Sequence, residues 1–149
     1  MSSPRVVYRN EFDGVPGAGH FMWLGRSKEI ISNLLPAHWA IIRIRLDDSE
    51  PEVIADGEHF WHSASSADGK WIVSDTLGPD TGLKLVNVAT GRYTTLCQSQ
   101  SANGKPDWTH PHPTFSPDGR KVVYNSDRSG IPQVYLAEVP ERLFAELTD

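Results

Sequence analysis

One short segment of the sequence, Asp107-Trp108-Thr109-His110-Pro111-His112-Pro113, carries two histidines and a carboxylate close together. On an extended strand, residues two apart point to the same side, so we expect His110 and His112 to present both imidazoles in one direction. Asp107 lies three residues earlier and can supply an oxygen ligand. With a further histidine from elsewhere in the chain, this donor set suits a divalent metal such as zinc, manganese, iron or nickel. The two prolines stiffen the segment because each fixes a backbone angle.

Three histidines also share one position relative to a repeated turn. Each lies six residues before the equivalent turn residue, in the pairs His20–Arg26, His62–Asp68 and His112–Asp118. At equivalent places in a repeat, the three imidazoles would converge at one end of the repeated units. The alternative is a proline-rich connection with exposed histidines, but the shared phase favours a metal site.

The turns that define this phase are Asp-Gly hairpin signals. Residues 65–70 match residues 115–120, and both contain a serine two residues before Asp-Gly, a pair that tolerates the positive φ of tight turns. In a third, degraded copy, residues 23–28, Arg26-Ser27 replaces Asp-Gly. Short apolar runs follow all three turns, so we expect strands at 28–33, 70–75 and 120–126. Further strands are expected at 39–46, 51–55, 83–88, 92–97 and 132–139.

A period of 42 to 50 residues with about four strands per unit is typical of β-propeller blades. We therefore predict an all-β fold, a partial β-propeller of about three four-stranded blades in a single domain, 1–149. The blades are expected at about 17–55, 58–98 and 107–139, with a short helix at about 140–147. A β-sandwich is the alternative, but it gives no reason for the turn to recur in register. Three blades do not close a ring, so we expect a homo-oligomer that closes the propeller, most simply a dimer with six blades.

Composition limits the class of protein further. The 149 residues are 38% hydrophobic with no long apolar run, which argues against disorder and against a membrane span. No secretory signal is visible, so a cytoplasmic location is expected. The single cysteine, Cys97, excludes a disulfide framework, and we expect it to pack within a blade. The net charge of −5 argues against nucleic acid as a partner.

Other candidate residues have a structural and a functional interpretation. His38 and His59 fall outside the repeat phase and are interpreted as surface or loop residues. Arg43 and Arg45 alternate with apolar residues, as on a solvated strand face, but such a face could bind an anionic ligand if it bordered the central channel of the propeller. The five tryptophans are most simply blade-packing residues, although Trp61 and Trp108 lie beside the histidines and could stack on a sugar ring.

Several of these motifs together resemble the C-terminal half of oligogalacturonate lyases, which are seven-bladed propellers related to TolB-type repeats. The resemblance extends over residues 17–139. It rests on Gly19-His20-Phe21-Met22-Trp23, on His62 before Asp68-Gly69, and on the segment from His110 to Gly119. The Ser-Pro-Asp-Gly turn is common to many propellers, whereas the histidine set is more specific.

The resemblance implies that the protein cleaves pectin fragments by β-elimination with a bound manganese ion. It implies that His62, His110 and His112 are metal ligands and that His20 is the base. Asp107 stands where the family has glutamine, and the family's catalytic arginine would precede residue 1. The expected partner is thus an oligogalacturonide or another acidic sugar. The alternative function is a non-catalytic propeller module that binds a sugar acid or a protein.

Overall fold

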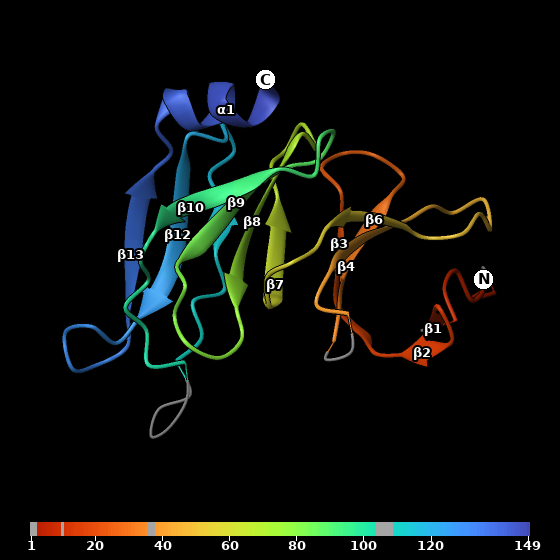
Figure 1. The fold of residues 1–149 in the computed structure, drawn as a ribbon, viewed down its shortest axis with the longest axis horizontal. Helices are drawn as coiled ribbons and strands as arrows, with labels where there is room; N and C mark the ends of the chain where they lie inside the picture. The colour runs from red at the N-terminus through yellow and green to blue at the C-terminus, as the bar shows by residue number, and fades with distance from the viewer. Residues whose placement is uncertain (1–2, 10, 36–37, 104–108) are drawn as a thin grey trace.

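The computed structural model describes residues 3–9, 11–35, 38–103 and 109–149, and the regular secondary structure of these residues is mostly β-strand (Figure 1). A short hairpin of β1 (Glu11–Phe12) and β2 (Val15–Pro16) comes first. Three larger antiparallel sheets follow in chain order, each with its strands hydrogen-bonded consecutively. One helix, α1 (Glu141–Thr148), ends the described chain.

The first two sheets have four strands each. The first comprises β3 (Ala18–Trp23), β4 (Ile30–Leu34), β5 (Ile41–Ile44) and β6 (Glu52–Ala55). The second comprises β7 (Phe60–Ser65), β8 (Trp71–Thr76), β9 (Leu83–Asn87) and β10 (Tyr93–Cys97). β4 and β8 fall where the sequence predicts the strands after the first two turns.

The third sheet has three strands in the part of the chain that the structure describes. They are β11 (Thr114–Phe115), β12 (Lys121–Ser126) and β13 (Gln133–Glu138). The expectation of four strands in this unit is therefore wrong for the described residues. Pro140 adopts extended backbone angles at the helix N-cap, and the chain continues as α1 instead of a fourth strand. The helix buries Leu143 and Leu147, as its amphipathic sequence predicts.

The second sheet lies between the other two, and both of its faces are buried. Adjacent residues of β8 face opposite ways: Ile72 belongs to the core shared with the first sheet, and Val73 to the core shared with the third sheet and α1. β9 is likewise buried along its whole length. Because both faces are buried, the sequences of β8 and β9 contain consecutive apolar residues instead of alternating apolar and polar residues.

The innermost strands of the three sheets meet. β7 contacts both β3 and β11, and each of these is the first strand of its own sheet. This arrangement of consecutive sheets confirms the predicted all-β, partial-propeller fold, with no closed ring among the described residues. It also places the beginnings of the three inner strands, where the histidines lie, next to one another.

Candidate metal centre

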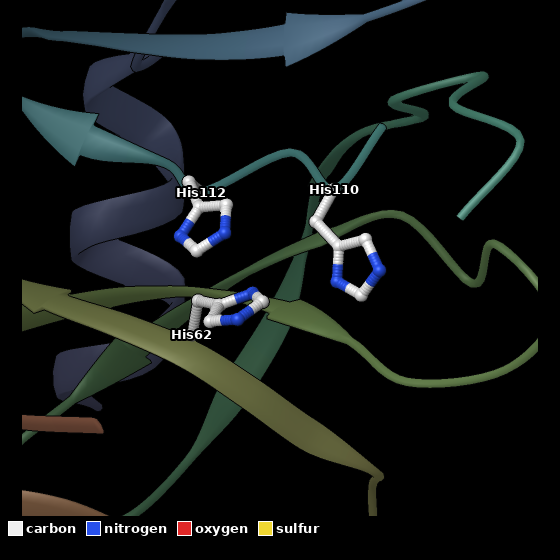
Figure 2. A group of neighbouring side chains, drawn as sticks. All are labelled: His62, His110 and His112. Carbon is white, nitrogen blue, oxygen red and sulfur yellow. The ribbon is translucent and has the colours of Figure 1, made fainter. Parts of the chain in front are cut away.

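His62, His110 and His112 converge on one point (Figure 2). One ring nitrogen from each lies within 4.8 Å of the others. The rings of His62 and His112 stack with centroids 3.6 Å apart, and the ring of His110 lies 5.3 Å from that of His62. His62 comes from β7 and is buried, His110 is half-buried, and His112 is exposed just before β11. The site is thus anchored in the protein on one side and open to solvent on the other.

The backbone at these histidines is irregular, which corrects the argument from an extended strand. His110 and His112 lie outside any strand, and His112 has a left-handed φ of 44°. Pro111 and Pro113 are buried, and the Asn125 N–H donates a 2.8 Å hydrogen bond to the Pro111 carbonyl. The two imidazoles therefore meet because this segment is fixed on β12 and bends at His112, not because they alternate along a strand.

The first two inner strands, β3 and β7, each contain a β-bulge at a similar position along the strand. On β7, Trp61 and His62 together oppose one residue of β8. On β3, His20 and Phe21 together oppose one residue of β4. Such bulges bend a strand and redirect side chains, and they are common beside functional sites. In both sheets the bulge includes the histidine that the repeat phase singled out.

Asp75 is a site residue that the sequence analysis missed. It lies on β8, and its side chain is 2% exposed. One carboxylate oxygen accepts the His62 backbone N–H at 2.7 Å. The other accepts the His62 Nδ1–H at 2.9 Å and the His112 backbone N–H at 3.0 Å. A carboxylate that holds Nδ1–H leaves Nε2 of His62 free to bind a metal, as is usual for ligating histidines.

A sequence signal for Asp75 exists at the same phase as the histidines. The residues seven positions after the three aligned turn residues are Asn33, Asp75 and Asn125. A polar side chain thus recurs at this position in each repeat, and only the second copy is a carboxylate. Asn33 is fully buried and donates to the Ser63 hydroxyl at 2.9 Å, so its role differs from that of Asp75.

His20 lies beside the three clustered histidines without being one of them. Its ring meets that of His62 edge-on, with centroids 4.4 Å apart, and its side chain is exposed. The ring is nevertheless partly buried against its neighbours, which lowers the pKa of His20 below 6.5, and the neighbouring His62 lowers it further. The same two causes lower the pKa of His112. Both imidazoles are therefore held in the neutral form that accepts a proton or binds a metal.

The remaining candidates from the sequence fall into three groups. Asp107 and Trp108 lie outside the described residues. Trp61 lies next to His20, with ring centroids 5.0 Å apart. The structure does not bring Arg43 and Arg45 to the histidines: Arg43 lies on β5, the third strand of its sheet, Arg45 follows the end of that strand, and both face Glu29 and Glu52.

The donor set fits a divalent metal ion. Two nitrogens bound to one ion lie at most about 4.2 Å apart, twice a typical metal–nitrogen length. The spacing of the three donors, within 4.8 Å, reaches this limit with small side-chain movements. Three imidazoles without a thiolate suit zinc, manganese, iron or nickel. The structure therefore contains a candidate divalent-metal site formed by His62, His110 and His112.

Comparison with known proteins agrees with this fold and identifies the family of the chain. The model of the oligogalacturonate lyase family matches residues 49–143. An oligogalacturonide lyase of Pectobacterium atrosepticum is 29% identical over 119 residues, covering 68% of this chain and 30% of that protein. An oligogalacturonate lyase of Dickeya dadantii is 35% identical over 69 residues, covering 44% of this chain and 18% of that protein. The chain thus spans about a third or less of the curated relatives that it matches.

Solved structures show the same relationship. The oligogalacturonate lyase of Vibrio parahaemolyticus superposes with a TM-score of 0.71 at 26% identity, covering 85% of this chain and 36% of that one. An oligogalacturonate lyase in complex with manganese gives 0.73 at 24% identity, with the same coverage of both chains. TolB from Acinetobacter baumannii gives 0.63 at 20% identity, covering 76% and 28%. The chain belongs to the oligogalacturonate lyase family.

In the described ranges of the chain, no helix has the length and apolar character needed to cross a membrane.

Proposed function

We propose that this chain carries the metal-binding and proton-accepting residues of an oligogalacturonate lyase, and that its substrate is an oligogalacturonide. The observation that carries the proposal is the position of His20 beside three histidines whose nitrogens lie within 4.8 Å of one another. The relatives are named as oligogalacturonate or oligogalacturonide lyases, and one related structure is described as a complex with manganese. Manganese is accordingly the metal that we propose for this site.

The proposed reaction is a β-elimination from a uronate. The electrons of the C5–H bond form the C4–C5 double bond, and the glycosidic oxygen on C4 leaves with the electrons of its own bond and gains a proton from water. A bound divalent cation would stabilise the charge that develops on the carboxylate next to C5. His20 is proposed to take the C5 proton, because its lowered pKa keeps the imidazole neutral near pH 7.

The roles of the other residues follow from where they lie. His62, His110 and His112 are proposed as ligands, and Asp75 as the group that fixes His62 and the backbone at His112. Asp107 remains the proposed fourth ligand from the sequence analysis. Trp61 is proposed to contact the sugar, since its ring lies next to that of His20. Arg43 and Arg45 are not included, because their guanidinium groups face glutamates.

The test is the absorbance of the unsaturated uronate product. Purified protein, manganese chloride and digalacturonate should give a rising absorbance, and His20→Ala should remove the rise while manganese still binds. Protein that binds manganese and digalacturonate but gives no rise would contradict the lyase proposal and support the alternative, a non-catalytic module that binds a sugar acid. A cytoplasmic location is part of the proposal and follows only from the sequence analysis.

We also propose that two copies of the chain associate. On the third sheet, Val134 and Leu136 of β13 are 73% and 58% exposed, and Ile131 in the loop before β13 is 62% exposed. Exposed apolar patches of this kind mark interfaces. The outer face of the first sheet is different, because Tyr8 and Phe12 pack against it. Association is therefore expected through the third sheet. Sedimentation equilibrium should show a dimer that Val134→Glu converts to monomer, and a wild-type monomer at high micromolar concentration would contradict it.

A further inference from the structure

A row of aromatic rings leads away from the three clustered histidines. From His62 the ring centroids lie 4.4 Å from His20, then 5.0 Å from His20 to Trp61. The row continues 6.4 Å from Trp61 to Trp39 and 4.5 Å from Trp39 to His59. Trp39 and His59 have no role in the proposed reaction, and the sequence analysis treated them as packing and surface residues. Their place in this row suggests a role in binding.

Trp39 is held in a backbone conformation that a bulky residue rarely adopts. Its φ is 48°, in the left-handed region, which is unfavourable for a residue with a side chain. Outside Asp, Asn and Gly, the described residues with positive φ are His20, Trp39, Gln100 and His112. Three of these four carry rings that belong to the metal cluster or to the row. Strained backbone concentrates at binding and catalytic sites, so Trp39 shares this property with the site.

The rings of Trp39 and His59 form a supported flat surface. They stack at an interplanar angle of 24°, and the His59 side chain is exposed. The His59 Nδ1–H donates to the Leu77 carbonyl at 3.3 Å, which fixes the ring. Glu58, the neighbouring carboxylate, pairs with Lys84 at 3.1 Å, so its negative charge is balanced. An acidic ligand can therefore approach this surface without meeting an unpaired carboxylate of Glu58.

Trp61 adds a polar group within the row. Its indole N–H is buried and has no hydrogen-bond acceptor among the described residues. Buried donors without an acceptor are unusual, because the hydrogen bond that the donor makes to water in the unfolded chain is lost on folding. A sugar presents both features that the row requires: an apolar ring face that packs on aromatic rings, and hydroxyl groups that accept hydrogen bonds.

We propose that Trp39, His59 and Trp61 form a binding subsite for a further sugar unit of an acidic oligosaccharide, next to the unit held at the metal. This inference rests on the proposed function, because it takes the substrate to be an oligogalacturonide. It adds a reason for chain-length preference: a monomer occupies the metal site alone, whereas a dimer or trimer also covers the aromatic rings. Trp39 is then a specificity residue that does not act on the reacting atoms.

The test measures the affinity for galacturonic acid and for its dimer and trimer by titration calorimetry, with manganese present. The wild-type protein should bind the dimer or trimer more tightly than the monomer. Trp39→Ala should weaken binding of the longer ligand by about tenfold, on the scale of one lost stacking contact, and leave monomer and manganese affinity unchanged. Trp39→Phe should restore part of the loss, because it replaces the ring.

Two controls separate the explanations. Trp39→Gly keeps the left-handed backbone accessible, so a loss of binding there reports the ring and not a change of backbone. Trp23→Ala removes a tryptophan that is 55% exposed on β3 and has no place in the row, and it should change nothing. If Trp39→Ala and Trp39→Gly bind every length as the wild type does, the subsite does not exist. If the wild type binds none of the three ligands, the proposed function itself fails.

Discussion

Each inner strand has a histidine near its beginning and a tight turn after its end, and these two ends of the repeat differ in how well their contacts are repeated. At the turn end, the second and third copies are nearly identical in their hydrogen bonds. The Ser66 hydroxyl donates to Asp68 at 2.6 Å, and the Lys70 N–H donates to the same carboxylate at 3.1 Å. The corresponding bonds of Ser116 and Arg120 to Asp118 have the same lengths. Each turn satisfies its own polar groups, so it repeats for a local structural reason.

At the histidine end, the repeat keeps its positions but not its contacts. His20, His62 and His112 are equivalent in phase, yet His62 is buried on Asp75 while the other two are exposed with left-handed backbone. Their environments depend on residues from different sheets. A repeated residue whose partners lie in its own repeat, such as the turn aspartate, therefore indicates a structural role. A repeated residue whose partners come from other repeats, such as the histidine, indicates a functional site.

The presence of a large groove does not by itself identify the functional end of the inner strands. A groove of about 1070 Å³ lies at the turn end, lined by residues of all three turns, including Ser27, Asp68 and Asp118. Several of its charged groups already have partners: Asp68 and Asp118 close their turns, and Arg120 pairs with Glu141 at 3.3 Å. The histidine end holds three histidine nitrogens close enough together to share one metal ion, so the chemistry favours it over the groove at the turn end.

The largest expected effect is the loss of metal binding when a clustered histidine is removed. His110→Ala or His112→Ala should weaken manganese or zinc binding by more than about 100-fold, because loss of an outer-shell partner alone costs 10–100-fold. Titration calorimetry measures the affinity, and circular dichroism checks the fold. His38→Ala and His59→Ala should bind metal as the wild type does. Equal metal affinity in all four variants would contradict the proposal that His110 and His112 are metal ligands.

The next effect concerns Asp75. Three N–H groups point at its carboxylate, so Asp75→Asn replaces one acceptor oxygen with an NH₂ group that faces a donor. Metal affinity should fall about 10–100-fold while the three ligands remain. The matched control is Asp80→Asn, since Asp80 also accepts two backbone N–H groups, from Gly82 and Gln100, but contacts no histidine. A similar loss in both variants would show a general effect on stability instead.

Much of the fold could be predicted because its determinants are local. Gly69 and Gly119, with φ of 72° and 70°, occupy the turns that the Asp-Gly pairs predict, and β8 and β12 follow directly. The short helix was predicted at about 140–147 and is found at Glu141–Thr148, directly after Pro140. Only the fourth strand of the last sheet was wrong for the described residues. These features need no knowledge of distant contacts.

The site was less predictable because it depends on register and on long-range contacts. The prediction that His62, His110 and His112 lie near one point agrees with their spacing, but the extended strand invoked for it is absent. Asp75 was missed because its role depends on the bulge in β7, which no local signal indicates. Trp39 was missed because a left-handed tryptophan is imposed by tertiary contacts rather than by local preference.

A smaller effect compares backbone strain at the two ends. Gly119→Ala at the turn end should lower the free energy of unfolding by about 1–2 kcal/mol, because alanine is strained at a φ of 70°. The added methyl group meets no atom within 4 Å, so the loss would come from the backbone and not from a clash. At the histidine end a residue with a side chain already occupies the left-handed backbone, so glycine should help. His112→Gly should be more stable than His112→Ala by about 1 kcal/mol, since glycine accepts the φ of 44°. Urea unfolding measures both. Equal stability of the two His112 variants would show that this backbone is not strained.

The smallest effect separates the two ends by pH in the metal-free protein. The pKa values of His20 and His112 are lowered from 6.5, mainly by burial, so the unfolded chain binds protons more readily than the folded protein below pH 6.5. The free energy of unfolding should therefore fall as the pH drops below 6.5, and stop falling below the folded pKa values. The double variant with alanine at both positions should lose most of this slope in urea unfolding between pH 8 and pH 5.

The turn end should respond in a separate, more acidic window. Hydrogen bonds from Ser116 and from the Arg120 N–H lower the pKa of Asp118 below 3.8. Burial opposes the shift at Asp68, but the bonds from Ser66 and Lys70 still lower its pKa overall. The stability that these carboxylates contribute is present above pH 3.8 and is lost as the pH falls through their folded pKa values. Asp118→Asn should flatten the slope below pH 4 and leave the slope between pH 8 and pH 5 unchanged. A change in both windows would mean that the two ends are coupled, which the separate hydrogen-bond networks do not predict.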